Sequence, residues 1–520
     1  MTNFLLRRGL AALALLLAGL LPHQPMISAS GWPSSASATV ACRDLDGDGR
    51  VTVVDIMRVS AHLGTSDPLY DIDGDGFVTI ADISALANCW RQPLTTTRRI
   101  NVPIFTGDAG FDQFAVAWFG QVTPSDNYAD VRVGVYYPEI LVVHVAIMDR
   151  LLWRDPTPSP SDLEDWDAVT LYLDLDGNVG AYPDSNSYRL VGQLWAQSGD
   201  NRQATYRGNG SGWVASPMVF SAGTTWRGNY PNDLIDDKGW TITFWIPFSS
   251  LGLSGPPSEG TIWGAALAVH DRDDSIGTPI PDKVWPPTMS GAQPASWGQF
   301  RFGLPTYTPP TVTSSQVTTI RHGLNGADVV DAAVGGHTTC GDGIDHWPQW
   351  GQTNYAGYTQ FNVQNQFDIS DWPCFSRYYV TFPLNAIPPG SSVVSATLTL
   401  HHFGGAGGGV WGTPPDSYIQ VLQIAETWSE ATLNWNNAPL AVQNLHWTWL
   451  PPAWPPWPGI PYNWDVSSAV AEALATGIPV RLAIFSADTD YHSGKYFYTS
   501  DTDDGNAIAR PTLRVRWGAP

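Results

Sequence analysis

The chain has 520 residues, a formal net charge of −22 at pH 7 and only 14% charged residues. This length predicts roughly three or four folding units, and 50 Gly with 42 Pro predict turns and short strands rather than helices. The acidic charge disfavours nucleic acid and acidic membranes as partners. The 25 Trp residues are numerous enough for both a core and a surface that stacks on sugars.

The N-terminus has the features of a secretory signal. Two Arg precede the apolar stretch 10–21, and a small-residue cleavage site lies at 36–38. We therefore predict a signal peptide over 1–38 and a secreted protein, either extracellular or at the cell surface. The apolar stretch is too short to span a bilayer comfortably, so no transmembrane span is expected. A lipobox that ends at Cys42 is the alternative.

Four Cys in an exported chain predict two disulfides. Cys42 and Cys89 bracket an Asp-rich segment, and a bridge between them would join its two ends. Cys340 and Cys374 lie within one later domain and would form the second bridge.

Two Asp-rich loops, 44–55 and 71–82, have the spacing of a calcium-binding loop. Ca²⁺ takes about six to eight oxygen ligands, and the loop places them at positions one, three, five, seven and twelve. The predicted ligands are Asp44, Asp46, Asp48, the carbonyl of Arg50 and Asp55 in the first loop, and Asp71, Asp73, Asp75, the carbonyl of Phe77 and Asp82 in the second. The repeat predicts two Ca²⁺ sites, each followed by a helix, at 55–63 and 82–90. A pair of Asp-Gly turns is the alternative.

A loop followed by a single helix, duplicated over 42–90, resembles a dockerin, the calcium-dependent module that docks secreted proteins onto cohesin domains. The resemblance implies Ca²⁺ as the cofactor and a cohesin-type partner. It also implies that loop positions ten and eleven contact the partner, and these are Val53, Val54, Ile80 and Ala81. Their apolar side chains suit a docking face. An internal calcium-stabilised spacer is the alternative, and we expect Ca²⁺ removal to unfold this segment and spare the rest of the chain.

The segment 99–304 predicts an antiparallel β-sandwich, because apolar stretches bounded by turn residues follow one another without a helical period. The predicted strands are 131–137, 140–149, 168–176, 240–248 and 261–271.

The order of these strands is similar to that of family 9 carbohydrate-binding modules and the wider DOMON-like group. The string WDAVTLYLD at 166–174 follows a strand that ends in Asp149, a later strand ends in His270 and Asp271, and WGQF at 297–300 closes the domain. The resemblance implies that a sugar binds between aromatic side chains. The candidates are Trp153, Trp195 and Trp285, each of which could instead belong to the core. The loop 174–178 is either half a calcium loop or a turn.

A Pro/Thr linker is predicted at 305–315, and it precedes a second β domain at 316–517. The strings ETWSEATLNWNNAP at 426–439 and WDVSSAV at 464–470, followed by a closing strand at 510–515, resemble DNRLRE domains. These are also called disaggregatase-related or family 96 carbohydrate-binding modules. The resemblance implies a β-sandwich on a secreted protein and polysaccharide as the ligand.

A Pro-rich insertion at 447–464 interrupts this domain. Proline fixes the backbone and lowers the entropy cost of holding a loop open. The aromatic residues on the insertion are Trp447, Trp449, Trp454, Trp457 and Tyr462. They predict either a row of rings on which a sugar chain stacks or a lid folded back on the sandwich.

We find no catalytic constellation in the sequence. Glu426 and Glu430 lie inside the family 96 string, where a role in orienting the backbone is favoured over acid–base chemistry. The predicted fold class is mainly β, with two antiparallel sandwiches preceded by a small helical, EF-hand-like module. The favoured function is non-catalytic polysaccharide binding within a catabolic or cell-envelope system. A glycoside hydrolase and a structural cell-surface protein are the alternatives.

Overall fold

The computed structural model describes residues 45, 51, 53–73, 75–89, 97–105, 110–137, 139–177, 180–197, 201–340, 346–406 and 414–519. The chain divides into two compact units, one that includes Val51–Cys89 and one that includes Trp90–Pro520. None of the helices within the described ranges has the length and apolarity that a membrane crossing requires. The predicted signal peptide over 1–38 and Cys42 lie outside the described residues.

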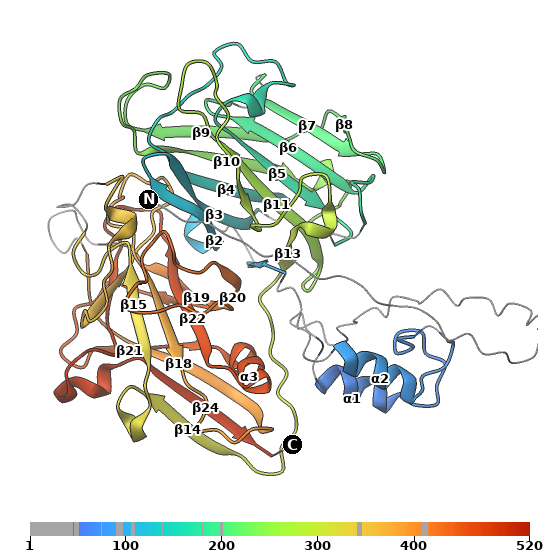
Figure 1. The fold of residues 1–520 in the computed structure, drawn as a ribbon, viewed down its shortest axis with the longest axis vertical. Helices are drawn as coiled ribbons and strands as arrows, with labels where there is room; N and C mark the ends of the chain where they lie inside the picture. The colour runs from blue at the N-terminus through green and yellow to red at the C-terminus, as the bar shows by residue number, and fades with distance from the viewer. Residues whose placement is uncertain are drawn as a thin grey trace, which may run out of the picture. The chain divides into compact units, whose positions relative to one another are not determined.

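The first unit is helical and contains α1 (Val53–Ala61) and α2 (Ile80–Cys89), drawn in blue in Figure 1. Each helix begins two residues earlier than the predicted one, and Asp55 and Asp82 lie in the first turn of their helices, as expected. A small apolar core holds the unit together, and it includes Val51, Val59, Ile72, Val78 and Leu86.

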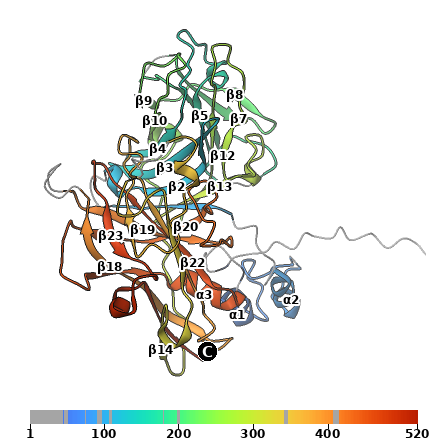
Figure 2. The same cartoon turned by 60° about the vertical axis from the view of Figure 1, so that its left-hand side comes forward.

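The first β-sandwich consists of two sheets built from residues between 99 and 302 (Figures 1 and 2). Sheet 1 has eight strands: β1 (Arg99–Val102), β5 (Ala168–Asp174), β6 (Ser187–Gln193), β7 (Gln203–Gly208), β8 (Trp213–Ala215), β11 (Ile262–His270), β12 (Lys283–Trp285) and β13 (Gly298–Phe302). Sheet 2 has five: β2 (Ala115–Thr123), β3 (Asp126–Tyr136), β4 (Ile140–Met148), β9 (Ser221–Arg227) and β10 (Gly239–Pro247). The strand orders are β1-β13-β11-β5-β6-β7-β8, with β12 beside β11, and β2-β3-β4-β10-β9. The pairs are antiparallel except β1–β13, which is parallel. This pair joins the first and last strands of the sandwich.

The second β-sandwich is built from residues between 316 and 518. Sheet 3 has five strands: β15 (Val330–Val334), β17 (Arg377–Phe382), β19 (Ser417–Ile424), β20 (Ala441–Leu450) and β22 (Val480–Ala487). Sheet 4 has six: β14 (Gln316–Arg321), β16 (Gln360–Val363), β18 (Ser392–Gly405), β21 (Ile460–Asp465), β23 (Lys495–Tyr498) and β24 (Thr512–Gly518). The strand orders are β15-β17-β22-β19-β20 and β14-β24-β18-β23-β16, with β21 beside β18. The sandwich also contains α3 (Ser467–Thr476), a helix that the sequence analysis did not predict and that ends at Gly477 with a φ of 70°.

Three large apolar clusters lie in these sandwiches. One fills the space between sheets 1 and 2, and a second fills the space between sheets 3 and 4. The third contains residues of both sandwiches, such as Trp118 and Met148 from sheet 2 and Tyr379 and Phe485 from sheet 3. The mainly β, antiparallel fold class predicted from the sequence is therefore confirmed.

Two features of the second sandwich bear on its stability. A disulfide joins Cys340 to Cys374, as predicted. The linker 305–315 contains no helix or strand, and it contacts the second sandwich where the Tyr307 hydroxyl donates a 2.6 Å hydrogen bond to the carbonyl of Val393. The predicted Cys42–Cys89 bridge cannot be placed, since Cys42 and the side chain of Cys89 lie outside the described residues.

Candidate functional site

The second Asp-rich loop is closed by hydrogen bonds from its backbone amides to its carboxylates. Asp82 accepts hydrogen bonds from the amides of Ile72 (2.6 Å), Asp73 (3.1 Å) and Thr79 (2.7 Å). Asp71 accepts them from the amides of Asp75 (3.1 Å) and Gly76 (2.8 Å). Gly76 has a φ of +95°, a conformation that favours glycine and lets the loop turn sharply.

The carboxylates of Asp71, Asp73 and Asp82 converge, and one oxygen from each lies within 4.8 Å of the others. Desolvation, together with repulsion from the neighbouring carboxylates, raises the pKa of Asp73. Burial acts to raise the pKa of Asp82, but the amide hydrogen bonds outweigh it and lower that pKa. Hard oxygen donors from a tight loop are the ligand set that Ca²⁺ prefers, so these residues fit the ion. Asp75 and Phe77 are exposed and stand outside the three-carboxylate group.

The first loop is described only in part. Asp55 is fully buried at the start of α1, whereas Asp44, Asp46, Asp48 and Arg50 lie outside the described residues. The side chains of the predicted docking residues Val53 and Val54 are likewise not described. Ile80 is 73% exposed and Ala81 is exposed, so an apolar side chain stands free at the start of α2.

A second group of carboxylates lies in the first sandwich, beyond the ends of β4 and β11. Oxygens of Asp149, Asp271 and Asp273 lie within 4.8 Å of one another. Asp149 and Asp271 are 3% and 2% exposed, and each has one buried oxygen without a hydrogen-bond partner among the described residues. Burial raises the pKa of Asp271 to about 7 and that of Asp273 to about 6, and burial beside Asp271 raises that of Asp149 well above its usual range. Near neutral pH this group needs protons or a cation.

The loop that follows β5 carries a third group, made of Asp174, Asp176 and Asp184. Burial, together with the nearby Asp176, raises the pKa of Asp174 to about 8, and neither oxygen of Asp174 has a hydrogen-bond partner among the described residues. This is the segment in which the sequence predicts half a calcium loop or a turn. Asn178, which belongs to it, lies outside the described residues. One oxygen from each of the three carboxylates lies within 4.8 Å of the others, so this group could hold a cation.

The three tryptophans predicted to bind sugar in the first sandwich lie in different environments. Trp153 and Trp285 are 7% and 2% exposed, and Trp285 packs in the core between sheets 1 and 2. Because the protein covers their ring faces, neither ring is free to stack on a sugar, and we exclude both from the candidate site. Trp195 is half-buried and stacks on Trp226 with 4.3 Å between ring centroids.

Sheet 1 carries a charged network on the face opposite its core. The Glu164 carboxylate pairs with the Arg189 guanidinium and accepts a 2.5 Å hydrogen bond from the Thr170 hydroxyl. His270 contacts Asp282 through Nδ1 at 3.0 Å, and Glu164 and Asp282 raise its pKa despite its burial. Partly exposed charges that fix one another's orientation can bind the hydroxyls of a sugar. The sequence analysis missed this network because its residues come from three strands and two connecting segments, and no single motif contains them all.

Aromatic rings surround this network. The guanidinium carbon of Arg189 lies 4.7 Å from the centroid of the Tyr206 ring, and Trp213 stacks parallel to Trp297 on the same face. Trp297 is only 2% exposed, so the rings available on the outer face of sheet 1 are the half-buried Tyr206 and Trp213. This face therefore combines oriented charges with two partly open rings, the two elements of a carbohydrate site.

The aromatic residues of the Pro-rich insertion divide into two groups. Trp447 and Trp449 are half-buried on β20, where both contact the Tyr418 ring. Tyr462 on β21 is half-buried against His402. Trp454 and Trp457, in the loop between β20 and β21, are 55% and 51% exposed. The insertion thus combines both predicted arrangements, with rings packed on the sandwich at its base and two free rings in its loop.

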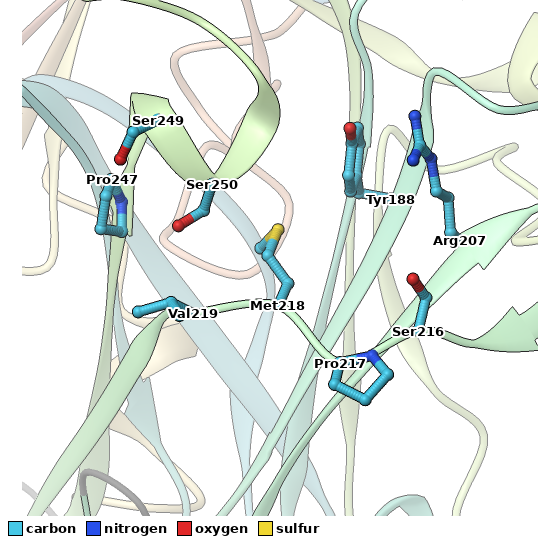
Figure 3. A pocket seen from close by; sticks show the side chains of 9 residues that line it. All are labelled: Tyr188, Arg207, Ser216, Pro217, Met218, Val219, Pro247, Ser249 and Ser250. Carbon is cyan, nitrogen blue, oxygen red and sulfur yellow. The ribbon is translucent and has the colours of Figure 1, made fainter.

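A hollow of about 500 Å³ lies where β6 and β7 approach the end of β10 (Figure 3). Figure 3 shows the Tyr188 ring beside the Arg207 side chain, with Ser249 and Ser250 across from them and Met218 between. The hollow lies away from the charged network, because Tyr188 points to the core side of β6 and Arg189 to the opposite side.

Glu426 and Glu430 both contact other residues of the protein. The Glu426 carboxylate pairs with Arg98, which precedes β1 in the first sandwich. The backbone carbonyl of Glu430 accepts a 2.7 Å hydrogen bond from the Asn354 side chain.

Two segments of the chain match the models of known protein families. Residues 42–89 match the model of the dockerin type I domain. Residues 348–515 match that of carbohydrate-binding module family 96. The chain carries a dockerin and a family 96 carbohydrate-binding module. Both resemblances noted in the sequence are thereby confirmed for these segments, and dockerin type I domains bind calcium.

Two similar solved structures are family 9 carbohydrate-binding modules from Caldicellulosiruptor kristjanssonii. The complex with cellotriose is 16% identical, covers 41% of this chain and 100% of its own, and has a TM-score of 0.29. The complex with glucose is 16% identical, covers 41% of this chain and 98% of its own, and has a TM-score of 0.28. None of the curated proteins matches the sequence.

Proposed function

We propose that this protein is a secreted, non-catalytic polysaccharide-binding protein that docks to a cohesin-type domain through its calcium-loaded dockerin. The observation that carries the proposal is the presence, on one chain, of a dockerin match and a carbohydrate-binding family match. A docking module attaches a binding module to a larger assembly. Polysaccharide catabolism or attachment to the cell envelope is the setting that such an arrangement serves.

Two Ca²⁺ ions would load the dockerin, one per loop. In the second loop, Asp71, Asp73 and Asp82 would hold the ion directly, with Asp75 and the carbonyl of Phe77 completing its shell. The ion would neutralise carboxylates that otherwise repel one another, and so it would fix the start of α2. The exposed Ile80 at that point is then held in place for a partner.

Polysaccharide would bind at two surfaces, one on each sandwich. The first is the outer face of sheet 1, supported by the Glu164–Arg189 pair and its surrounding rings. The second is the loop that carries Trp454 and Trp457, whose rings are exposed. An extended glycan suits both surfaces, because each offers rings for the apolar side of a sugar. The outer face of sheet 1 adds charged groups for the sugar hydroxyls.

A glycan array probed with the full chain, with and without Ca²⁺, tests the binding proposal, and a pull-down with cohesin domains tests docking. We expect retention of one polysaccharide class and cohesin binding that requires Ca²⁺. Release of reducing sugar from the retained polysaccharide, abolished by one Asp or Glu substitution, would instead identify a hydrolase. Self-association in Ca²⁺ without any glycan binding would identify a structural envelope protein.

A further inference from the structure

The inner strands of sheets 2 and 3 are buried on both faces. In β4, nearly every side chain is buried, with Val145 and Ile147 in the core of the first sandwich and Ala146 and Met148 in the cluster shared with the second. All residues of β19 in sheet 3 are buried as well. By contrast, β18 in sheet 4 alternates between buried and partly exposed residues, as expected for a sheet with one solvent face. The four sheets therefore stack with three apolar layers between them.

The middle layer is centred on a buried cation, Arg377 of β17. Its guanidinium carbon lies 4.1 Å from the ring centroid of Trp118 in the first sandwich and 4.1 Å from that of Trp435 in the second. The guanidinium donates a 2.7 Å hydrogen bond to the Tyr128 hydroxyl of the first sandwich. Two of its nitrogens have no hydrogen-bond partner among the described residues, so the two indole faces provide much of the charge's stabilisation.

Buried polar groups of each sandwich find their partners in the other. Asn444 of β20 exchanges two hydrogen bonds of 2.8 Å with the backbone of Asn101 in β1. Asn436 does the same with the backbone of Val122 in β2, at 2.8 and 3.0 Å. The fully buried Arg132 guanidinium of β3 donates to the carbonyls of Asn365 and Asp488 in the second sandwich. Separation would leave these groups and the shared apolar layer in contact with water.

We propose that the two sandwiches form one permanent, rigid unit, in which sheet 2 of the first is the binding partner of sheet 3 of the second. The linker 305–315 then does not act as a hinge, and any ligand sites on the two sandwiches stand at a fixed distance from each other. The family 96 segment 348–515 is not self-sufficient, because its sheet 3 carries an apolar face that the first sandwich covers. This inference holds whatever the sandwiches bind.

The experiment is to cut the linker in the folded protein. A site for a sequence-specific protease inserted between Pro309 and Pro310, in an exposed part of the linker, allows cleavage of the full chain under native conditions. We expect the two fragments to elute as one complex in size-exclusion chromatography and to separate only in denaturant. If either fragment elutes or sediments alone after native cleavage, the proposal is wrong.

Variants of the cleavable chain identify the contact. Arg377→Ala and Trp118→Ala each remove part of the cation–indole contact, and their fragments are expected to dissociate at lower denaturant concentrations than the parent fragments. Arg514→Ala, which changes an exposed residue of β24 in sheet 4, is the matched control and should behave like the parent. If a variant does not fold, the cleavage of the parent chain still decides the question. Equal dissociation of all variants and the parent would contradict the role given to Arg377.

Discussion

The two exposed tryptophans of the Pro-rich loop give the sharpest test of carbohydrate binding. Trp454 and Trp457 are 55% and 51% exposed. A Trp side chain offers roughly 250 Å², so about 130 Å² of each is open, and a sugar on one face covers about 65 Å². At about 25 cal/mol per Å² this burial stabilises the complex by ~1.6 kcal/mol per ring. We therefore expect Trp454→Ala and Trp457→Ala each to weaken binding by a factor of about ten to twenty.

Isothermal titration calorimetry of the full chain with the polysaccharide retained on the array measures this effect. Tyr182→Ala, which removes a ring that is 59% exposed on a loop of the first sandwich, is the matched control and should leave the affinity unchanged. Thermal unfolding of each variant should match that of the parent, because the exposed rings contribute little to the core. Wild-type affinity in both Trp variants would refute the reasoning and leave the loop as a cover for the sandwich.

Three further measurements test the other sites. Arg189→Gln should weaken glycan binding by about tenfold or more, because it removes the charged partner of Glu164 on sheet 1; unchanged affinity in a titration would contradict this. Asp82→Asn should abolish one calcium-binding event in calorimetry, since its carboxylate closes the second loop; an unchanged number of binding events would exclude that role. Burial raises the folded-state pKa of Asp331 to about 7, so the folded state holds the proton more tightly than the unfolded state and stability should fall as pH rises from about 4 to 7. Urea unfolding at pH 5 and pH 8 should show this loss, to which Asp331 contributes at most about 3 kcal/mol between these two pH values, and Asp331→Asn should reduce it by that share; an identical pH dependence in the variant would contradict the assignment.

Local sequence patterns were enough to predict the convergence of carboxylates in the second Asp-rich loop and the fold class. The positions of Asp71, Asp73 and Asp82 follow from a loop geometry that depends only on nearby residues, and the structure brings their carboxylates together. The Cys340–Cys374 bridge followed from the pairing of Cys within one domain. The charged network around Arg189 could not be predicted in the same way. Its members are brought together by strand register, which no short stretch of sequence reveals.

One feature of the sequence indicates the contact between the sandwiches, and the strand prediction did not use it. A strand with one solvent face alternates between apolar and polar residues, whereas 140–148, ILVVHVAIM, is apolar at every position but His144. His144 is itself paired, with Nε2 at 2.8 Å from the carbonyl of Phe367 in the second sandwich. A continuous apolar stretch in an antiparallel sheet indicates that something covers its second face. The stretch does not identify the second sandwich as the element that covers it. Arg377, which lies in that contact, looks in the sequence like any other of the 26 Lys and Arg residues.

The buried charged residues of the two sandwiches divide into two classes. The division indicates which carboxylates need a bound proton or cation. The charges of Arg377 and Arg132 are stabilised by indole faces, a hydroxyl and carbonyls of the protein, although each guanidinium also keeps at least one nitrogen without a hydrogen-bond partner among the described residues. Asp149 and Asp174 have buried oxygens that no described group of the chain satisfies. An unpaired buried carboxylate is expensive, so it either keeps a proton or holds a cation. Since each of these two residues converges with two further carboxylates, a divalent cation satisfies the whole group where a single proton would not.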